Sequence, residues 1–357
     1  MKRQIIKGPG YCAVTEDGHL VEYLPTEQAD HCGDILLGRI DRMMPGMKCA
    51  FADIGRKRSG FLPLDEVSRS FSGPPARSGE LMILQIKKEE IGEKGAFLTR
   101  DIAFPGKLII LMPLNRYIGV SARISDQEMR DRLKKEGNEI AGGRFGLIMR
   151  NASAGIESEM VRLEAENLYK QWINAAEKAS AGGKPGRIIW SGDPVEQIKA
   201  DYVASGFEEI CASEKDNQEI RRELRQAAER KVMLPGGGNI VIDLCEAMTV
   251  IDINTASAGT GRTKRQNVLE TNLEACGMIA RQVRLRNLNG IILIDFIDMD
   301  EETDRSLVCE KLTECFSYDR IKTVIHGWTK LGLMEMTRKR IHQGQKFQTE
   351  DTADSYD

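Results

Sequence analysis

The sequence predicts a multidomain α+β protein in which a small β-barrel near the N-terminus precedes a mixed region and an α/β layer. The length of 357 residues allows two or three domains at about 150 residues each. Short strand-like runs broken by glycine and proline fill residues 33–100. From residue 228 the order strand, strand, helix, strand, helix is typical of a sheet covered by helices.

The composition narrows the class of protein. A net charge of −3, with 41% hydrophobic and 29% charged residues, fits an ordinary globular protein and neither a histone-like basic chain nor a disordered one. Any nucleic-acid surface must therefore be local. No apolar run approaches the ~20 residues that span a bilayer, and no apolar core of a signal peptide follows the N-terminus. We therefore expect a cytoplasmic protein without a membrane span.

The 8 cysteines and 4 histidines show no C-x-x-C spacing and no histidine pair at a metal-ligand interval, so we expect neither zinc nor a disulfide framework. Scattered reduced thiols that behave as small apolar side chains are the simpler interpretation.

The N-terminal hundred residues are predicted to be strands. Residues 1–32 contain short strands joined by turns such as Glu16-Asp17-Gly18. Farther along, Met82, Leu84 and Ile86 alternate with the residues between them, which is the period of a strand. Several such short strands in residues 33–100 favour a small β-barrel.

The region after Pro105 contains helices with recognisable starts. Ser125–Glu128 has the pattern of a capping box. A helical stripe follows, and Asp193-Pro194 starts a further helix, with proline at the first helical position. Between these helices lies a glycine-rich break at residues 182–186, a candidate domain boundary. The stripe consists of Val161, Ala165, Leu168, Trp172 and Ala176.

The last third is predicted to form the α/β layer. Strands are expected at residues 239–243 and 247–254, and a helix is expected to open at Thr271. The near-continuous apolar run in residues 290–298 indicates a strand covered on both faces. Cations in Met336–Arg340 are expected at a solvated helix end, and the polar residues 344–357 are expected to be a disordered tail.

Carboxylates at two strand ends form the first candidate site. Asp252 closes one apolar strand, and Asn254 projects from the same face because side chains repeat every two residues. Asp295 closes the second strand in the same manner. If the strands are neighbours, two carboxylates and an amide converge in a hard-oxygen site of the kind that Mg²⁺ prefers. The open alternative is that these aspartates cap turns or helices.

Aromatic and basic residues of the barrel form the second candidate site. Phe51 lies opposite a face of small and apolar residues, Phe61 follows ten positions later, and Lys94 comes from another hairpin. Aromatic rings and cations on a small barrel can stack bases and neutralise phosphates of single-stranded nucleic acid. The open alternative is that the phenylalanines belong to the core and the lysine is merely solvated.

A weaker phosphate-binding pattern occurs at Arg150-Asn151, because arginine can hold a phosphate through two parallel hydrogen bonds and asparagine adds a donor.

Taken together, these strings resemble the ribonuclease E/G family of bacterial endoribonucleases. The resemblance touches almost the whole chain, and its last four strings are specific. The matching strings are Gly38–Met47, Ala50–Gly55, Gly60–Leu64, Asn239–Asp243 with Glu246-Ala247, Ile251–Thr255, Thr271–Ala275, Arg281–Arg286, Gly290–Met299 and Leu331–Arg340.

The resemblance implies a domain plan. Residues 33–100 would be an S1-type OB barrel that binds RNA, and residues 101–189 a mixed α/β region like a 5′ sensor. Residues 1–32 with 190–227 would form a reduced part resembling ribonuclease H, and residues 228–343 a catalytic domain resembling deoxyribonuclease I.

The resemblance also implies residue roles. Asp252 and Asp295 would hold Mg²⁺, with Mn²⁺ as an alternative ion, while Asn254 would support Asp252 or position the scissile phosphate. Phe51, Phe61 and Lys94 would contact RNA. Arg150, Asn151 and Lys322 would bind the 5′ phosphate.

Departures from the family pattern modify these expectations. Asn151 replaces a threonine and Lys322 replaces an arginine, so we expect a weakened preference for a 5′ monophosphate. The family's zinc link and small domain do not follow Arg340, so any homo-oligomer is expected not to be linked by zinc.

The leading prediction is a Mg²⁺-dependent endoribonuclease that cleaves single-stranded RNA, and not DNA, in RNA processing or decay, leaving 5′ phosphate and 3′ hydroxyl ends. A non-catalytic S1-type RNA-binding protein of the same family is the alternative. A scaffold that binds other proteins of RNA decay is a weaker one.

Overall fold

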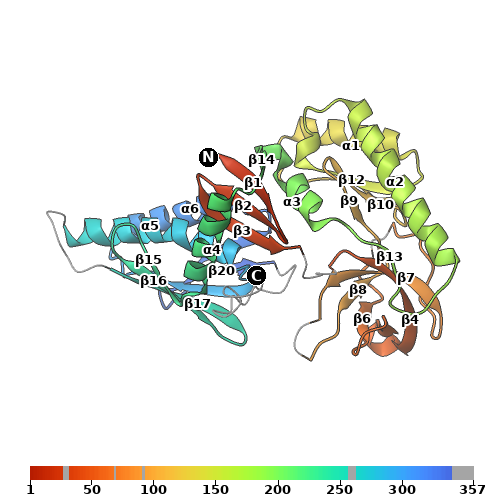
Figure 1. Cartoon of the computed structure of the whole chain (residues 1–357), viewed down its shortest axis with the longest axis horizontal. Helices are drawn as coiled ribbons and strands as arrows, with labels where there is room; N and C mark the ends of the chain where they lie inside the picture. Colours follow the sequence, from red (N-terminus) through yellow and green to blue (C-terminus); the bar gives the residue numbers. More distant parts are fainter. Residues whose placement is uncertain (27–31, 68–69, 91–92, 256–262, 340–357) are drawn as a thin grey trace. The chain divides into compact units, whose positions relative to one another are not determined.

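The computed structural model describes residues 1–26, 32–67, 70–90, 93–255 and 263–339. Contacts divide the chain into two compact units (Figure 1). One, called here the barrel unit, is Ala29–Gly206. The other, called the sheet unit, is Met1–Gln28 with Phe207–Asp357. The predicted tail at residues 344–357 lies outside the described residues.

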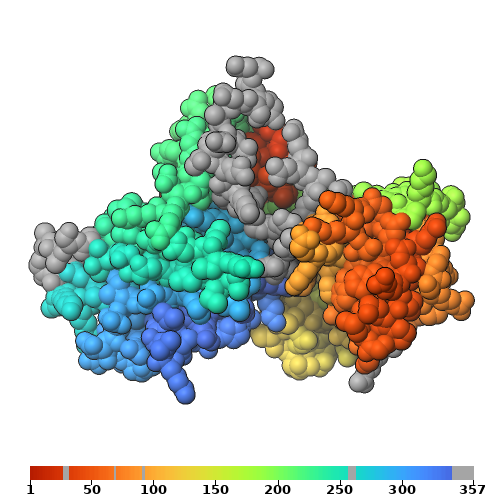
Figure 2. Space-filling model, turned by 90° about the horizontal axis from the view of Figure 1, so that it is seen from below, coloured from red at the N-terminus to blue at the C-terminus, as the bar shows by residue number. Residues whose placement is uncertain are grey.

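The barrel unit begins with a closed five-stranded barrel of the kind expected for an S1 or OB-type domain. Its strands follow the order β4-β5-β6-β8-β7, and pairing of β4 with β7 closes the barrel. Met82, Leu84 and Ile86 are buried, as their alternation predicts. The barrel segment, orange in the space-filling view, forms one rounded lobe (Figure 2). The strands are β4 (Ile35–Met44), β5 (Cys49–Asp53), β6 (Gly60–Pro63), β7 (Leu81–Lys88) and β8 (Phe97–Thr99).

A second sheet and two long helices complete the barrel unit. The sheet order is β11-β12-β10-β9, and the predicted stripe on α2 is buried at Val161, Ala165 and Leu168. The predicted capping box at the start of α1 is replaced by a simpler cap, in which Asp126 accepts hydrogen bonds from two backbone N–H groups. The elements are β9 (Phe104–Pro105), β10 (Ile109–Met112), β11 (Ile118–Val120), α1 (Gln127–Ala141), β12 (Gly146–Met149), η2 (Asn151–Ser153), α2 (Ser158–Ser180), β13 (Ile188–Trp190), α3 (Pro194–Tyr202) and η3 (Val203–Ser205).

In the sheet unit, a four-stranded sheet of order β14-β1-β2-β3 packs against α4. Thus β14 and α4 join the N-terminal strands, whereas β13 and α3 belong to the barrel unit. Arg284 on α5 reaches this sheet through paired hydrogen bonds of 2.8 and 3.1 Å to Glu16. The elements are β1 (Arg3–Gly8), β2 (Tyr11–Glu16), β3 (His19–Pro25), β14 (Glu208–Cys211) and α4 (Glu214–Ala228).

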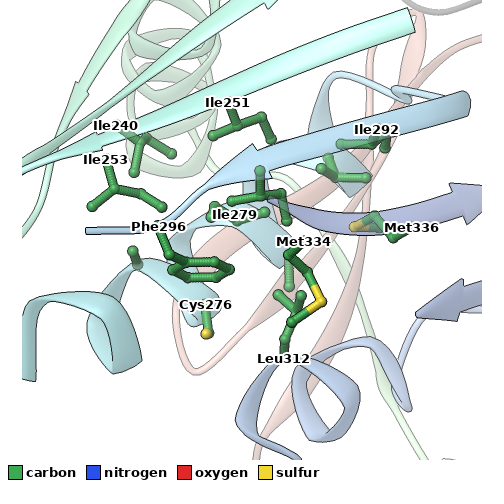
Figure 3. Packing of buried hydrophobic residues seen from close by; sticks show 14 of the residues in the cluster. Ile240, Ile251, Ile253, Cys276, Ile279, Ile292, Phe296, Leu312, Met334 and Met336 are labelled. Atoms are coloured by element: carbon green, nitrogen blue, oxygen red, sulfur yellow. The ribbon is translucent and has the colours of Figure 1, made fainter. Parts of the chain in front are cut away.

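A six-stranded sheet of order β15-β16-β17-β18-β20-β19 forms the rest of the sheet unit. Its pairings are antiparallel except for β17 with β18, which is parallel. Helices α5 and α6 contribute to the core on one face of this sheet, where Ile251, Ile253 and Ile292 are buried (Figure 3). The elements are β15 (Lys231–Met233), β16 (Asn239–Leu244), β17 (Met248–Asn254), α5 (Lys264–Leu285), β18 (Gly290–Asp295), α6 (Glu302–Phe316), β19 (Thr323–Trp328) and β20 (Met334–Arg338).

Two sequence predictions for this sheet and its helix are wrong. Helix α5 begins at Lys264 and not at Thr271, because Thr263 and Gln266 form the capping box. Thr271 instead bonds its hydroxyl back to the carbonyl of Asn267 within the helix. Strand β18 is covered on one face only, since Ile291 is 47% exposed on the other. Ile291 lengthens the apolar run even though it faces solvent, and a long apolar run is typical of a strand that is buried on both faces.

The cations near Met336 also differ from prediction. This segment is strand β20, and the Arg338 side chain is only 1% exposed and paired with Asp319, which is 0% exposed. The guanidinium donates to Asp319 at 2.7 Å, to the side chain of Asn287 at 2.9 Å and to the carbonyl of Leu288 at 3.0 Å. The pair therefore joins β20 to the segments on either side of it.

Replacing Arg338 should destabilise the sheet unit. Arg338→Met leaves Asp319 buried without its cation, so we expect a loss of about 3–5 kcal/mol in the free energy of unfolding. Urea unfolding followed by Trp328 fluorescence, with Trp172 and Trp190 changed to Phe, measures it. Arg222→Leu, which breaks an exposed ion pair with Glu219, is the control and should change stability by less than about 1 kcal/mol. Equal losses of stability in the two variants would contradict a stabilising role for the buried Arg338–Asp319 pair.

Candidate functional site

The parallel pairing of β17 and β18 places two carboxylates next to each other. Asp252 and Asp295 occupy the same register position, and neighbouring strands lie about 4.8 Å apart. Both aspartates are exposed, whereas Ile251 and Ile294 beside them are buried. Side chains alternate along a strand, so both carboxylates project from the open face of the sheet, opposite the core.

Asn254 supports this pair. Its Nδ2 donates a hydrogen bond of 2.8 Å to Oδ2 of Asp252. The bond uses one oxygen of Asp252 and orients the carboxylate. The structure thus brings together the three residues that the sequence singled out at these strand ends.

The electrostatics of the pair favour a bound cation. The pKa of Asp295 is raised above its ordinary value by partial burial and then by the negative charges of Asp252 and Asp298. Like charges at this spacing repel, and a divalent ion between them would relieve the repulsion. Two carboxylates with remaining positions for water are the protein ligands that Mg²⁺ commonly takes, so these side chains fit that ion. Within the described ranges, no larger cluster of His, Cys, Asp or Glu offers another metal site.

The barrel carries a row of three aromatic side chains. Register pairs Phe51 with Phe61 and Phe61 with Phe97 across β5, β6 and β8. Their ring centroids are 5.8 and 5.6 Å apart. All three are half-buried, while Ala50, Ala52 and Leu98 on the same strands are fully buried. The row therefore lies on the outside of the barrel and not in its core.

A groove of about 710 Å³ runs along this aromatic row. Lys94 lines it, and the opposing charges of Arg58 and Glu93 pair at 3.2 Å along it. Sequence reasoning missed Phe97, although the signal was present: Ala96 and Leu98 are small or aliphatic residues on either side of an aromatic one, the pattern already noted at Phe51.

The predicted phosphate-binding site at Arg150 contains an acidic residue, Asp201, that already pairs with the arginine. The Arg150 guanidinium, whose side chain is 19% exposed, bonds to the carboxylate of Asp201 and donates at 2.7 Å to the carbonyl of Gly106. The segment after Gly106 is fixed by Glu164 on α2, whose carboxylate accepts hydrogen bonds from the backbone N–H groups of Lys107 and Leu108 at 2.7 and 2.8 Å.

The other two residues predicted to bind the 5′ phosphate lie at separate places. Asn151 is exposed and begins η2, directly after Arg150. Lys322 is also exposed but precedes β19 in the sheet unit. The structure therefore joins Arg150 and Asn151 within one unit and puts Lys322 in the other.

Comparison with known proteins identifies the family. Residues 103–220 and 215–341 match the model of the ribonuclease E/G family. The chain belongs to the ribonuclease E/G family. Among its relatives, ribonuclease G of Haemophilus influenzae is 33% identical over 93% of this chain and 77% of that protein. Ribonuclease G of Escherichia coli is 32% identical over 87% and 73%. Ribonuclease E of Synechocystis is 30% identical over 97% of this chain and 58% of that protein.

Within the described part of this ribonuclease E/G chain, no helix is both long and apolar enough to cross a membrane.

Removing one carboxylate should change how the protein responds to Mg²⁺. The pKa of Asp295 is raised in the folded protein, so its contribution to stability is present at low pH and is lost as the pH rises through that raised pKa. At neutral pH in a chelator, Asp295→Asn should therefore raise the Tm slightly. Mg²⁺ at 100 times its Kd should raise the Tm of the unaltered protein by about 5 °C or more and leave the variant unchanged.

Differential scanning fluorimetry with and without Mg²⁺ measures both shifts. Glu310→Gln, an exposed carboxylate on α6, is the matched control and should keep the response to Mg²⁺. Equal Mg²⁺ stabilisation of the Asp295→Asn protein would remove Asp295 from the metal site.

Proposed function

We propose that this protein is a Mg²⁺-dependent endoribonuclease that cleaves single-stranded RNA in RNA processing or decay and leaves 5′ phosphate and 3′ hydroxyl ends. The observation that carries the proposal is the register pairing of Asp252 with Asp295 on the open face of the sheet. Membership of the ribonuclease E/G family supports it, as do the relatives named ribonuclease G and ribonuclease E.

Asp252 and Asp295 would hold Mg²⁺ through their exposed oxygens, and the hydrogen bond from Asn254 would keep Asp252 in the orientation that binding requires. When bound, the ion supplies Lewis-acid stabilisation of the phosphate oxygens and a lowered pKa for a water molecule. The fixed backbone of the two paired strands keeps both carboxylates in place, so little reorganisation is needed during the reaction.

The barrel would hold the RNA strand. Phe51 and Phe61 present half-exposed rings for base stacking, and Lys94 lines the same groove for phosphate contact. We assign residues 33–100 to an S1-type domain on this basis. By the family resemblance, residues 101–189 correspond to a 5′-sensor region, residues 1–32 with 190–227 to a reduced part like ribonuclease H, and residues 228–343 to a domain like deoxyribonuclease I.

Preference for a 5′ monophosphate would be weak in this protein. Arg150 is the cation expected to bind that phosphate, but Asp201 already uses one side of its guanidinium and Gly106 another. A phosphate would have to displace a charge-assisted bond before it gained one. Asn151 and Lys322 are exposed and offer donors to a phosphate.

Cleavage tests the metal pair. Purified protein should cut a fluorescently labelled unstructured RNA in the presence of Mg²⁺, and Asp295→Asn should lower the rate by about a hundredfold or more. Glu310→Gln should cut as the unaltered protein does. Equal rates for Asp295→Asn and the unaltered protein would remove the catalytic assignment. RNA binding without any cleavage by the unaltered protein would favour the non-catalytic alternative.

Freeing Arg150 should strengthen 5′ recognition. Asp201→Asn removes the competing charge, and a charge-assisted hydrogen bond to phosphate is worth about 1.5–3 kcal/mol. We expect the ratio of kcat/KM for 5′-monophosphorylated over 5′-hydroxylated RNA to rise about tenfold. Glu157→Gln, an exposed carboxylate in the same unit, should leave the ratio as it is. An unchanged ratio in Asp201→Asn would show that Arg150 does not sense the 5′ end.

A further inference from the structure

Phe97 continues the aromatic row beyond the two phenylalanines expected to bind RNA. We infer that Phe97 stacks a third nucleotide base, so that the barrel groove holds three consecutive unpaired nucleotides. This inference rests on the proposed function and deepens it, because it sets the length of RNA that the barrel engages.

The strand register supports a row of three stacking faces. Strands β5, β6 and β8 are hydrogen-bonded neighbours, and their register aligns Phe51, Phe61 and Phe97 in one line across the barrel. The ring centroids are 5.8 and 5.6 Å apart, and the ring planes are inclined to each other at 68° and 49°, so each ring offers a separate face to a base. A third ring at a similar interval and on the same side of the barrel extends the row by one position. Successive bases of a single strand can stack on aromatic side chains arranged in this way.

Burial distinguishes Phe97 from a core residue. Its neighbours Ala96 and Leu98 are 1% and 0% exposed, whereas Phe97 is half-buried and lines the groove. A phenylalanine needed only for packing would be expected on the buried side of this strand, where Leu98 lies. The half-exposed ring instead presents apolar surface to the open groove, and a base that stacked there would cover it.

Two cations lie beside the extended row. Lys94 lines the groove, and the Lys88 ammonium is 5.3 Å from the centroid of Phe97. Lys88 is exposed, so its flexible side chain can move aside for a base while keeping its charge next to the backbone phosphate. Arg58 is partly neutralised by Glu93 at 3.2 Å. The ligand that these groups suit is an unpaired, negatively charged strand, bound without regard to base identity because every base has a stacking face.

Binding measured in a chelator tests the inference without cleavage. Fluorescence anisotropy with 5′-labelled oligouridylate gives the Kd of the unaltered protein, and Phe97→Leu should raise it about tenfold, in line with stacking of one base. Phe71→Leu is the matched control, because Phe71 lies against Arg100 in the same unit and does not line the groove. It should bind as the unaltered protein does.

Abasic substitutions locate the base. The probes are nine-nucleotide RNAs, each with one abasic position. An abasic nucleotide at one position should weaken binding to the unaltered protein but not to Phe97→Leu. This position should differ from the positions at which Phe51→Leu and Phe61→Leu lose their sensitivity. Phe97→Tyr keeps the ring and should restore the affinity. If Phe97→Tyr binds as poorly as Phe97→Leu, the ring has a packing role and the inference is wrong.

The remaining outcomes are equally decisive. Unchanged affinity in Phe97→Leu, with RNA binding intact, overturns the third base and leaves the proposed function standing. Failure of the unaltered protein to bind any oligonucleotide overturns both. If Asp295→Asn binds RNA normally but does not cleave it, the proposed function stands whatever the result at Phe97.

Discussion

The parallel pairing of β17 with β18 is the constraint on which the candidate metal site depends. Parallel strands cannot be joined by a tight turn, so the chain must cross over between them, and α5 makes that crossing. The helix contributes Cys276 and Ile279 to the core beneath the sheet, which ties the crossover to the strands (Figure 3). Because both strands run in the same direction, both of their carboxyl ends reach one edge, and Asp252 meets Asp295 there.

In the barrel, closure of the sheet determines which side chains point outward. Its closure by β4 and β7 buries one side of every strand, and alternation then forces Phe51, Phe61 and Phe97 outward in a line. The proposed stacking of bases on this row requires a rigid support, since a base gains most from a ring that is already held in place. The buried Ala50, Ala52 and Leu98 on the same strands supply that support.

Local sequence pattern predicts the outward side chains of several strands, and the wrong predictions have identifiable causes. Period-two alternation placed Phe51 and Asp252 on the correct faces of their strands. The helix start at Thr271 failed because Thr263 and Gln266 offered an earlier capping box beyond a glycine-rich stretch. The apolar run predicts two covered faces for β18, because an exposed Ile291 is indistinguishable in sequence from a buried one. The basic segment at Arg338 was misjudged because its partner, Asp319, lies 19 positions away.

The sequence by itself determined the barrel strands, the strands that end near Asp252 and Asp295, and the family to which the chain belongs, because these depend on short-range periodicity and on the order of strings. Only the tertiary structure decided which strands became neighbours, that Phe97 completes the aromatic row and that Asp201 binds Arg150. Those relations join residues far apart along the chain, such as Phe61 with Phe97 and Arg150 with Asp201. Contacts of this kind arise when the whole chain packs, and no local pattern encodes them.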